Sequence, residues 1–159
     1  MRYFFLAAAL LLAGFVVYGQ IEKRQTLTAL LPQDIKFGPS PVLPKGIELA
    51  NIYADPAGKA EPVWIARVRY AAGARLMPHS HPDQRIVTVL SGTYYQGASD
   101  KFDEKKLVAY PPGSFVVVPA GVNHFAWAKD GEVVVQESGI TPTGIAYVDP
   151  KDDPRNSKK

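Results

Sequence analysis

The chain has 159 residues, 47% of them hydrophobic, which is enough for one domain with a substantial core but not for two. It contains no Cys, so a disulfide framework, a thiolate metal site and cysteine catalysis are all excluded. The formal net charge of +3 is small and spread along the chain, which argues against a nucleic-acid-binding protein.

Residues 1–19 have the composition of an export signal. A cationic start at Arg2 is followed by an unbroken apolar run from Tyr3 to Tyr18. A basic head before an apolar run of this length is typical of a secretory signal peptide. The alternative is an uncleaved anchor over residues 3–18, because a membrane-spanning helix needs about 20 apolar residues. We therefore expect a periplasmic or secreted protein, or one anchored to the inner membrane by this segment alone.

The middle of the chain is predicted to be all-β. Gly and Pro together make 27 residues (13 + 14), an excess that favours many turns. Short apolar runs alternate with turn signals at intervals of about ten residues, which is typical of an antiparallel sandwich or barrel. Strands are expected over residues 62–70, 85–90, 93–96, 106–110, 114–118, 123–129, 132–137 and 144–148.

These patterns divide the rest of the chain into three parts. Residues 20–61 form an N-terminal arm with the first strands, and residues 62–148 form the barrel. Residues 149–159 are polar apart from two prolines, and we expect a disordered tail because they cannot bury enough apolar surface. Only residues 26–35 and 98–105 are compatible with a short helix or helical turn.

All three histidines of the chain lie in two segments in which glycines stand at set distances from the histidines. These segments read G-x5-H-x-H-x10-G from residue 73 to residue 92 and G-x5-P-x-G-x2-H from residue 113 to residue 124. His79 and His81 are two residues apart, so on a strand their side chains lie on the same face. Two imidazoles side by side on an inward face require a third partner, and a metal ion is the usual one.

The two segments, with the 20 residues between them, resemble the pair of motifs that defines the cupin superfamily. The resemblance covers about residues 63–148 and is strongest to small bacterial single-domain cupins, with similar domains in some zinc-binding anti-sigma factors. It implies a single-domain antiparallel β-barrel, or jelly roll. It also implies a divalent transition metal (Zn, Fe, Mn, Ni or Cu) on His79, His81 and His124, with a small molecule as ligand.

One position departs from the family pattern. Arg85 stands where the fourth metal ligand, a Glu, is expected. In one reading the site has three His ligands, and Arg85 holds a substrate carboxylate or similar anion. In a second, Glu137, or else Asp83 or Gln84, supplies the fourth ligand. In a third, Arg85 pairs with a carboxylate such as Asp83 or Glu137 and no metal is bound. Some members of the superfamily keep the fold without the metal.

Strand alternation suggests further residues of a ligand pocket. Met77 has the same parity as the first two motif histidines, and alternation after Gly92 directs one of Tyr94 and Tyr95 inward. We expect Met77 and Tyr95 to contact substrate together with Arg85. If His124 points inward, so do Ala126 and Ala128, and their small side chains leave room for a ligand.

Two classes of function fit these features. The chain is either a metal-dependent enzyme, such as an oxygenase or isomerase, or a protein that binds or senses a metal or a small molecule without turnover. Fold alone does not decide between them. An edge strand in a chain this small also favours a homodimer.

Overall fold

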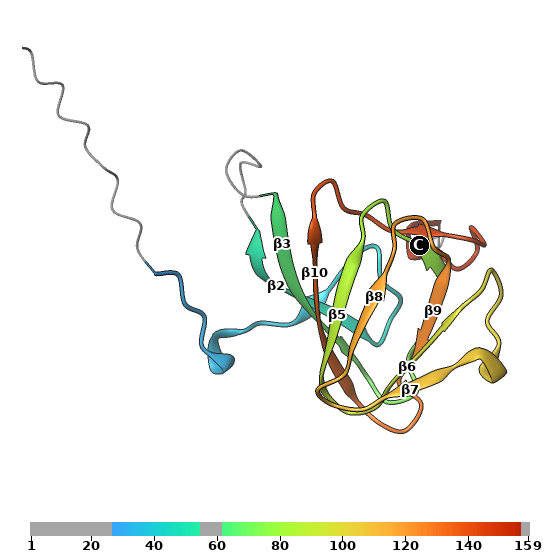
Figure 1. The fold of residues 1–159 in the computed structure, drawn as a ribbon, viewed down its shortest axis with the longest axis horizontal. Helices are drawn as coiled ribbons and strands as arrows, with labels where there is room; N and C mark the ends of the chain where they lie inside the picture. The colour runs from blue at the N-terminus through green and yellow to red at the C-terminus, as the bar shows by residue number, and fades with distance from the viewer. Residues whose placement is uncertain (1–26, 55–61, 157–159) are drawn as a thin grey trace, which may run out of the picture.

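Two antiparallel β-sheets face one another in the computed structural model, which describes residues 27–54 and 62–156 (Figure 1). The first sheet has the strand order β1-β2-β3-β10-β5-β8, and the second has the order β11-β4-β9-β6-β7. The first sheet consists of β1 (Gly38–Pro39), β2 (Ile47–Ala54), β3 (Val63–Tyr70), β10 (Val133–Ile140), β5 (Arg85–Ser91) and β8 (Phe115–Val118). The second consists of β11 (Ala146–Tyr147), β4 (Arg75–Ser80), β9 (His124–Trp127), β6 (Tyr94–Ala98) and β7 (Val108–Tyr110). This arrangement confirms the predicted all-β jelly roll.

Helical structure is confined to three 3-10 turns in the described residues: η1 (Pro32–Asp34), η2 (Glu104–Lys106) and η3 (Pro154–Asn156). The first two overlap or adjoin the segments expected to hold a helical turn. No helix within residues 27–54 and 62–156 is long and apolar enough to cross a membrane. The predicted signal or anchor, residues 1–19, lies outside the described part of the chain.

The central strand β3 illustrates how the sequence forms the sheet. Its buried residues alternate with half-buried or exposed ones, because successive side chains of a strand point to opposite faces. β3 pairs with β2 on one side and with β10 on the other, so both of its edges are hydrogen-bonded. Since β1 and β2 are integral to this sheet, the barrel begins before residue 62, where the sequence pattern placed its boundary.

Apolar side chains from both sheets form the core. Val89, Val133 and Val135 come from the first sheet, and Ala126 and Ala128 come from β9 and its end. All five are 0–1% exposed. The inward orientation predicted for Ala126 and Ala128 is therefore confirmed.

An irregularity in β4 sets which of its side chains face the interior. Leu76 pairs with Ala126 and His79 pairs with His124, so three steps along β4 correspond to two along β9. This extra residue is a β-bulge, which changes the face to which the following side chains point. Leu76 and His79 therefore both face inward although their spacing is odd.

Residues 149–156 differ from the predicted disordered tail. The Asp149 and Asp153 carboxylates accept hydrogen bonds from the backbone amides two residues later, both at 3.0 Å. The Arg155 guanidinium contacts Asp153 at 2.7 Å and reaches the carbonyl of Ile145 at 3.2 Å. Aspartates stabilise turns by such local bonds without any apolar burial, which is why hydrophobicity failed to indicate order here.

Candidate metal centre

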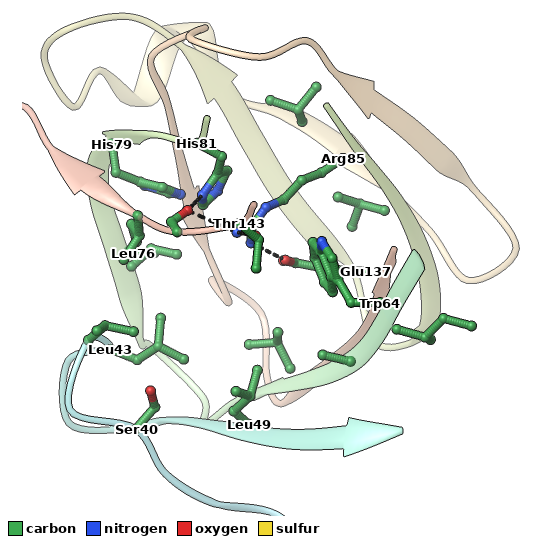
Figure 2. A pocket seen from close by; sticks show the side chains of 18 of the residues that line it. Ser40, Leu43, Leu49, Trp64, Leu76, His79, His81, Arg85, Glu137 and Thr143 are labelled. Carbon is green, nitrogen blue, oxygen red and sulfur yellow. Dashed lines mark hydrogen bonds and ion pairs between the residues drawn. The ribbon is translucent and has the colours of Figure 1, made fainter. Parts of the chain in front are cut away.

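The three histidines converge at one end of the barrel. His79 belongs to β4, His81 lies just beyond that strand, and His124 begins β9. Their candidate ligand atoms all lie within 4.8 Å of one another, and each residue is at most 6% exposed. The pairing of His79 with His124 across β4 and β9 brings the two motifs together. Figure 2 shows His79 and His81 side by side on the cavity wall.

Each imidazole is held by a backbone carbonyl through Nδ1. His79 Nδ1 lies 2.7 Å from the Met77 oxygen, and His124 Nδ1 lies 3.0 Å from that of Val122. His81 Nδ1 lies 2.6 Å from the carbonyl of Gly144. A carbonyl oxygen only accepts, so each Nδ1 carries the proton and each Nε2 keeps a free lone pair. Oriented imidazoles with Nδ1–H bound to a carbonyl are the usual form of a metal ligand. The donor set therefore fits a transition metal.

The surroundings keep these imidazoles neutral at pH 7. Burial lowers the pKa of His79 well below its usual value, and the neighbouring His124 and His81 lower it further. Burial and the positive charge of Arg85 lower the pKa of His81 from 6.5 to about 3. The pKa of His124 is also lowered, chiefly by burial. Neutral imidazole is the form that binds metal, so no proton has to be displaced near neutral pH.

Arg85 lies near His81 on the cavity wall, where protein groups already bind its guanidinium. Its Nη1 donates to the Glu137 carboxylate at 2.7 Å. Its Nη2 donates to the Thr143 hydroxyl at 2.9 Å and to the Gly144 carbonyl at 3.0 Å. The guanidinium carbon also stacks 4.8 Å from the centre of the Trp64 ring. Figure 2 shows this group extending toward Thr143 and Glu137.

A cavity of about 360 Å³ adjoins the histidines inside the barrel. This volume is at the small end of the range of roughly 300–1,000 Å³ found for small-molecule sites. Its walls are mainly apolar and aromatic, from both sheets and from the two segments that cover the barrel near the chain ends. The lining includes Leu43, Leu49, Trp64, Val68, Tyr70, Leu76, Val87, Tyr94 and Ile145.

Comparison with known families agrees with this geometry. A family model described as Cupin matches residues 41–145, about two thirds of the chain. The chain belongs to the cupin family. The match extends through β2, which places the start of the domain well before residue 62.

Solved structures share the fold of this cupin at low sequence identity. The polyketide cyclase RemF from Streptomyces resistomycificus is 15% identical with a TM-score of 0.69, over 82% of this chain and 91% of that one. A cupin-like protein from Thermotoga maritima is 21% identical with a TM-score of 0.59, over 73% and 88%. KdgF from Halomonas sp. is 18% identical with a TM-score of 0.57, over 71% and 94%. No curated protein sequence matches the chain significantly.

Glu137, the candidate fourth ligand, is placed in an ion pair with Arg85. It is 8% exposed, and its carboxylate lines the cavity without joining the histidine cluster in the described residues. The histidine cluster of the first reading and the ion pair of the third are thus both present in this cupin. Because Glu137 and other protein acceptors occupy Arg85, its expected role in holding a substrate anion has no support from these contacts.

The other two predicted substrate contacts, Met77 and Tyr95, do not line the cavity. The bulge in β4 leaves Met77 on the outer side of the strand, with Leu76 inward in its place. Tyr95 lies opposite Trp127 in the β6–β9 pairing, and its hydroxyl donates to Asp130 outside the barrel. Both expectations are corrected by strand register, which the sequence does not reveal.

Two cavity residues on β6 take their place. Tyr94 is 2% exposed and lines the cavity, so alternation after Gly92 sends the first tyrosine inward and not the second. Gln96 lies opposite Ala126 and lines the same wall. Gln96 is two residues after Tyr94, so the sequence could have predicted that it faces inward. That prediction depended on recognising that Tyr94, and not Tyr95, is the inward tyrosine.

Proposed function

We propose that this cupin binds one divalent transition metal through Nε2 of His79, His81 and His124. The metal then serves to bind or transform a small organic molecule in the adjoining cavity. The observation that carries the proposal is the common orientation of the three imidazoles. Each Nδ1 is fixed by a carbonyl, each Nε2 is free, and all three rings are neutral at pH 7.

Three nitrogen ligands suit Zn, Fe, Mn, Ni or Cu, and they leave coordination positions for a ligand. When bound, such an ion polarises a coordinated oxygen as a Lewis acid. The chain itself contributes the orientation of the three imidazoles and an enclosed, largely apolar cavity. These contributions are compatible with an oxygenase or isomerase.

The alternative is a cupin that binds or senses without turnover. The observation that favours it is the ion pair between Arg85 and Glu137. This pair occupies the carboxylate that lines the cavity, which would otherwise be available as a catalytic base. In the described part of the chain, the cavity lining holds one carboxylate, so an enzyme would depend on the metal or its bound water as the base.

Metal analysis of the purified full chain tests the proposal. The protein is stripped with chelator, incubated separately with Zn, Fe, Mn, Ni and Cu, desalted, and measured by inductively coupled plasma mass spectrometry. We expect one ion per chain for at least one metal, and loss of that ion in His79→Ala and in His124→Ala. Tyr95→Phe, on the outer face of β6, is the matched control and retains the metal. Failure of all five metals to bind would refute the metal centre.

We also propose that the protein is exported and that it forms a homodimer. Residues 1–19 support a periplasmic or secreted location, or an anchor in the inner membrane. Fractionation of cells that express the full chain with a C-terminal tag checks this location. The edge strand β8 supports the homodimer, and sedimentation equilibrium measures it.

A further inference from the structure

The charged groups that line the cavity in the described residues are already paired. Arg85 is bound to Glu137, and Arg155 contacts Asp153 at 2.7 Å. The histidines are neutral for the reasons given above. A charged group that enters the cavity would therefore lose its hydration and would meet no unpaired opposite charge on a protein side chain. Such a transfer is strongly unfavourable.

Two buried side-chain nitrogens of cavity-lining residues have no hydrogen-bond partner in the described residues. One is Arg85 Nε, which lies 3.8 Å from an Asp83 carboxylate oxygen, and the other belongs to Gln96. The side-chain amide nitrogen of Gln96 makes no hydrogen bond, and this residue is 6% exposed. The hydroxyl of Tyr70, a residue that is 0% exposed, interacts with Tyr94, whose ring lies 5.6 Å away, and keeps capacity for a further hydrogen bond. Buried polar groups in proteins are nearly always hydrogen-bonded, so the unpaired amide donor on β6 and the Tyr70 hydroxyl on β3 together indicate a ligand oxygen.

Gln96 is positioned to bind a ligand that also reaches the histidines. Gln96 lies opposite Ala126, and Ala126 is two residues from His124 on the same inward face of β9. Aromatic rings from Trp64, Tyr70 and Tyr94 line the rest of the cavity and favour a ring as the body of the ligand.

We propose that the part of the ligand that fills this cavity beyond the metal is uncharged, with an aromatic ring and a hydroxyl or carbonyl oxygen held by Gln96 and Tyr70. This inference rests on the proposed function for its location, but the contacts that carry it are independent of the metal. It replaces the anionic ligand that the sequence suggested from Arg85.

Three probes of one ring size test this ligand class: 2-naphthol, 2-naphthoate and naphthalene. Binding to the metal-free full chain is measured by fluorescence titration at neutral pH, so that a carboxylate cannot bind through a metal. We expect 2-naphthol to bind at least about tenfold more tightly than 2-naphthoate, since only the naphthoate must bury a charge. Equal or tighter binding of naphthoate would overturn the proposal, as would the absence of naphthol binding.

Variants then test the two polar contacts. Gln96→Leu and Tyr70→Phe each weaken 2-naphthol binding by about threefold to tenfold, the usual effect of one hydrogen bond, and leave naphthalene binding unchanged. Tyr95→Phe changes neither and is the matched control for Tyr70→Phe. Unchanged naphthol binding in both variants would refute the assigned contacts. If either variant fails to fold, the comparison of probes on the wild-type chain decides the ligand class.

Metal loading of the same preparation separates this inference from the proposed function. Metal binding without naphthol binding would refute the ligand class and leave the metal centre intact. Naphthol binding without metal binding would refute the metal centre and support the ligand class.

Discussion

Arg85, on β5, contacts three other segments of the chain at the cavity wall. It contacts Glu137 on β10, and Thr143 and Gly144 in the segment that follows it. It also stacks over Trp64 on β3, whose indole nitrogen donates to Asp83 at 3.0 Å. Gly144 accepts from Arg85 and from His81 at once, so the guanidinium helps to fix the carbonyl that orients one of the metal-binding imidazoles.

Removal of Arg85 is expected to be costly because its partner stays buried. The side chains of Arg85 and Glu137 are only 14% and 10% exposed. Arg85→Met leaves the Glu137 carboxylate unpaired and is expected to lower the free energy of unfolding by about 3 kcal/mol. Arg85→Met combined with Glu137→Met removes both charges and recovers most of that loss. Urea unfolding of the single and double variants measures the difference.

A half-exposed pair on the same sheet provides the control. Arg69 and Glu48 are ion-paired with side chains 37% and 38% exposed, so solvent screens their interaction. Arg69→Met is therefore expected to cost much less stability than Arg85→Met. If Arg85→Met costs no more than Arg69→Met, the buried pair has no special structural role.

At the level of elements, a single glycine lets β10 pack closely against Trp64 and Asp83. Gly139 lies opposite Trp64 in the β3–β10 pairing. A Cβ built at Gly139 would lie 2.4 Å from an Asp83 carboxylate oxygen and 2.9 Å from the Trp64 ring. The strand thus approaches the Trp64–Asp83 hydrogen bond more closely than any other residue type permits.

Gly139→Ala is expected to destabilise the protein by about 1–3 kcal/mol, because the methyl group displaces Asp83 and Trp64. The same variant shifts the tryptophan fluorescence of the folded state, since Trp64 is one of two tryptophans in the chain. Gly38→Ala on β1 is the matched control: its Cβ would meet nothing within 4 Å, and it is expected to be neutral within about 0.5 kcal/mol. Equal stabilities for the two variants would contradict the close approach.

At the scale of the whole molecule, the segments near the two chain ends cover the barrel together. Val42 and Leu43 line the cavity before β2, and Thr143 and Ile145 line it after β10. The Tyr147 hydroxyl donates to the carbonyl of Val42 at 2.8 Å and joins the two segments. Burial helps to raise the pKa of Tyr147 to about 12, so this bond persists throughout the physiological pH range.

The buried histidines make the stability of the metal-free protein depend on pH. The pKa of His81 is lowered from 6.5 to about 3 on folding. Between these values the unfolded chain binds a proton that the folded chain does not, so stability falls as pH falls below 6.5. At about pH 5.5 the loss from His81 alone is on the order of 1 kcal/mol relative to neutral pH.

Urea unfolding of metal-free wild type and His81→Gln, at neutral pH and at about pH 5.5, measures this loss. The variant retains the acidic residues of the wild type, so the difference between the two proteins isolates the histidine. We expect a smaller loss of stability in His81→Gln than in wild type. An equal loss in both proteins would show that His81 binds its proton equally well in the folded state.

The sequence by itself determined the β architecture and the convergence of the histidines. Alternating strands and turn residues predict the barrel, because side-chain burial follows the period of the strand. The motif spacing, through its resemblance to the cupin motifs, then identifies His79, His81 and His124, and two-residue alternation places the first two on a common face.

Only the tertiary structure decided which other residues face the cavity. Because of one bulged residue in β4, Leu76 faces the cavity instead of Met77. The β6–β9 register likewise turns Tyr94 and Gln96 toward the cavity and Tyr95 away from it. It also pairs Arg85 with Glu137, 52 residues away, and so removes the free cation that the sequence offered to an anionic ligand. The physical reason is that register and long-range pairing depend on packing between distant strands, and a shift of one residue reverses every face that alternation would assign.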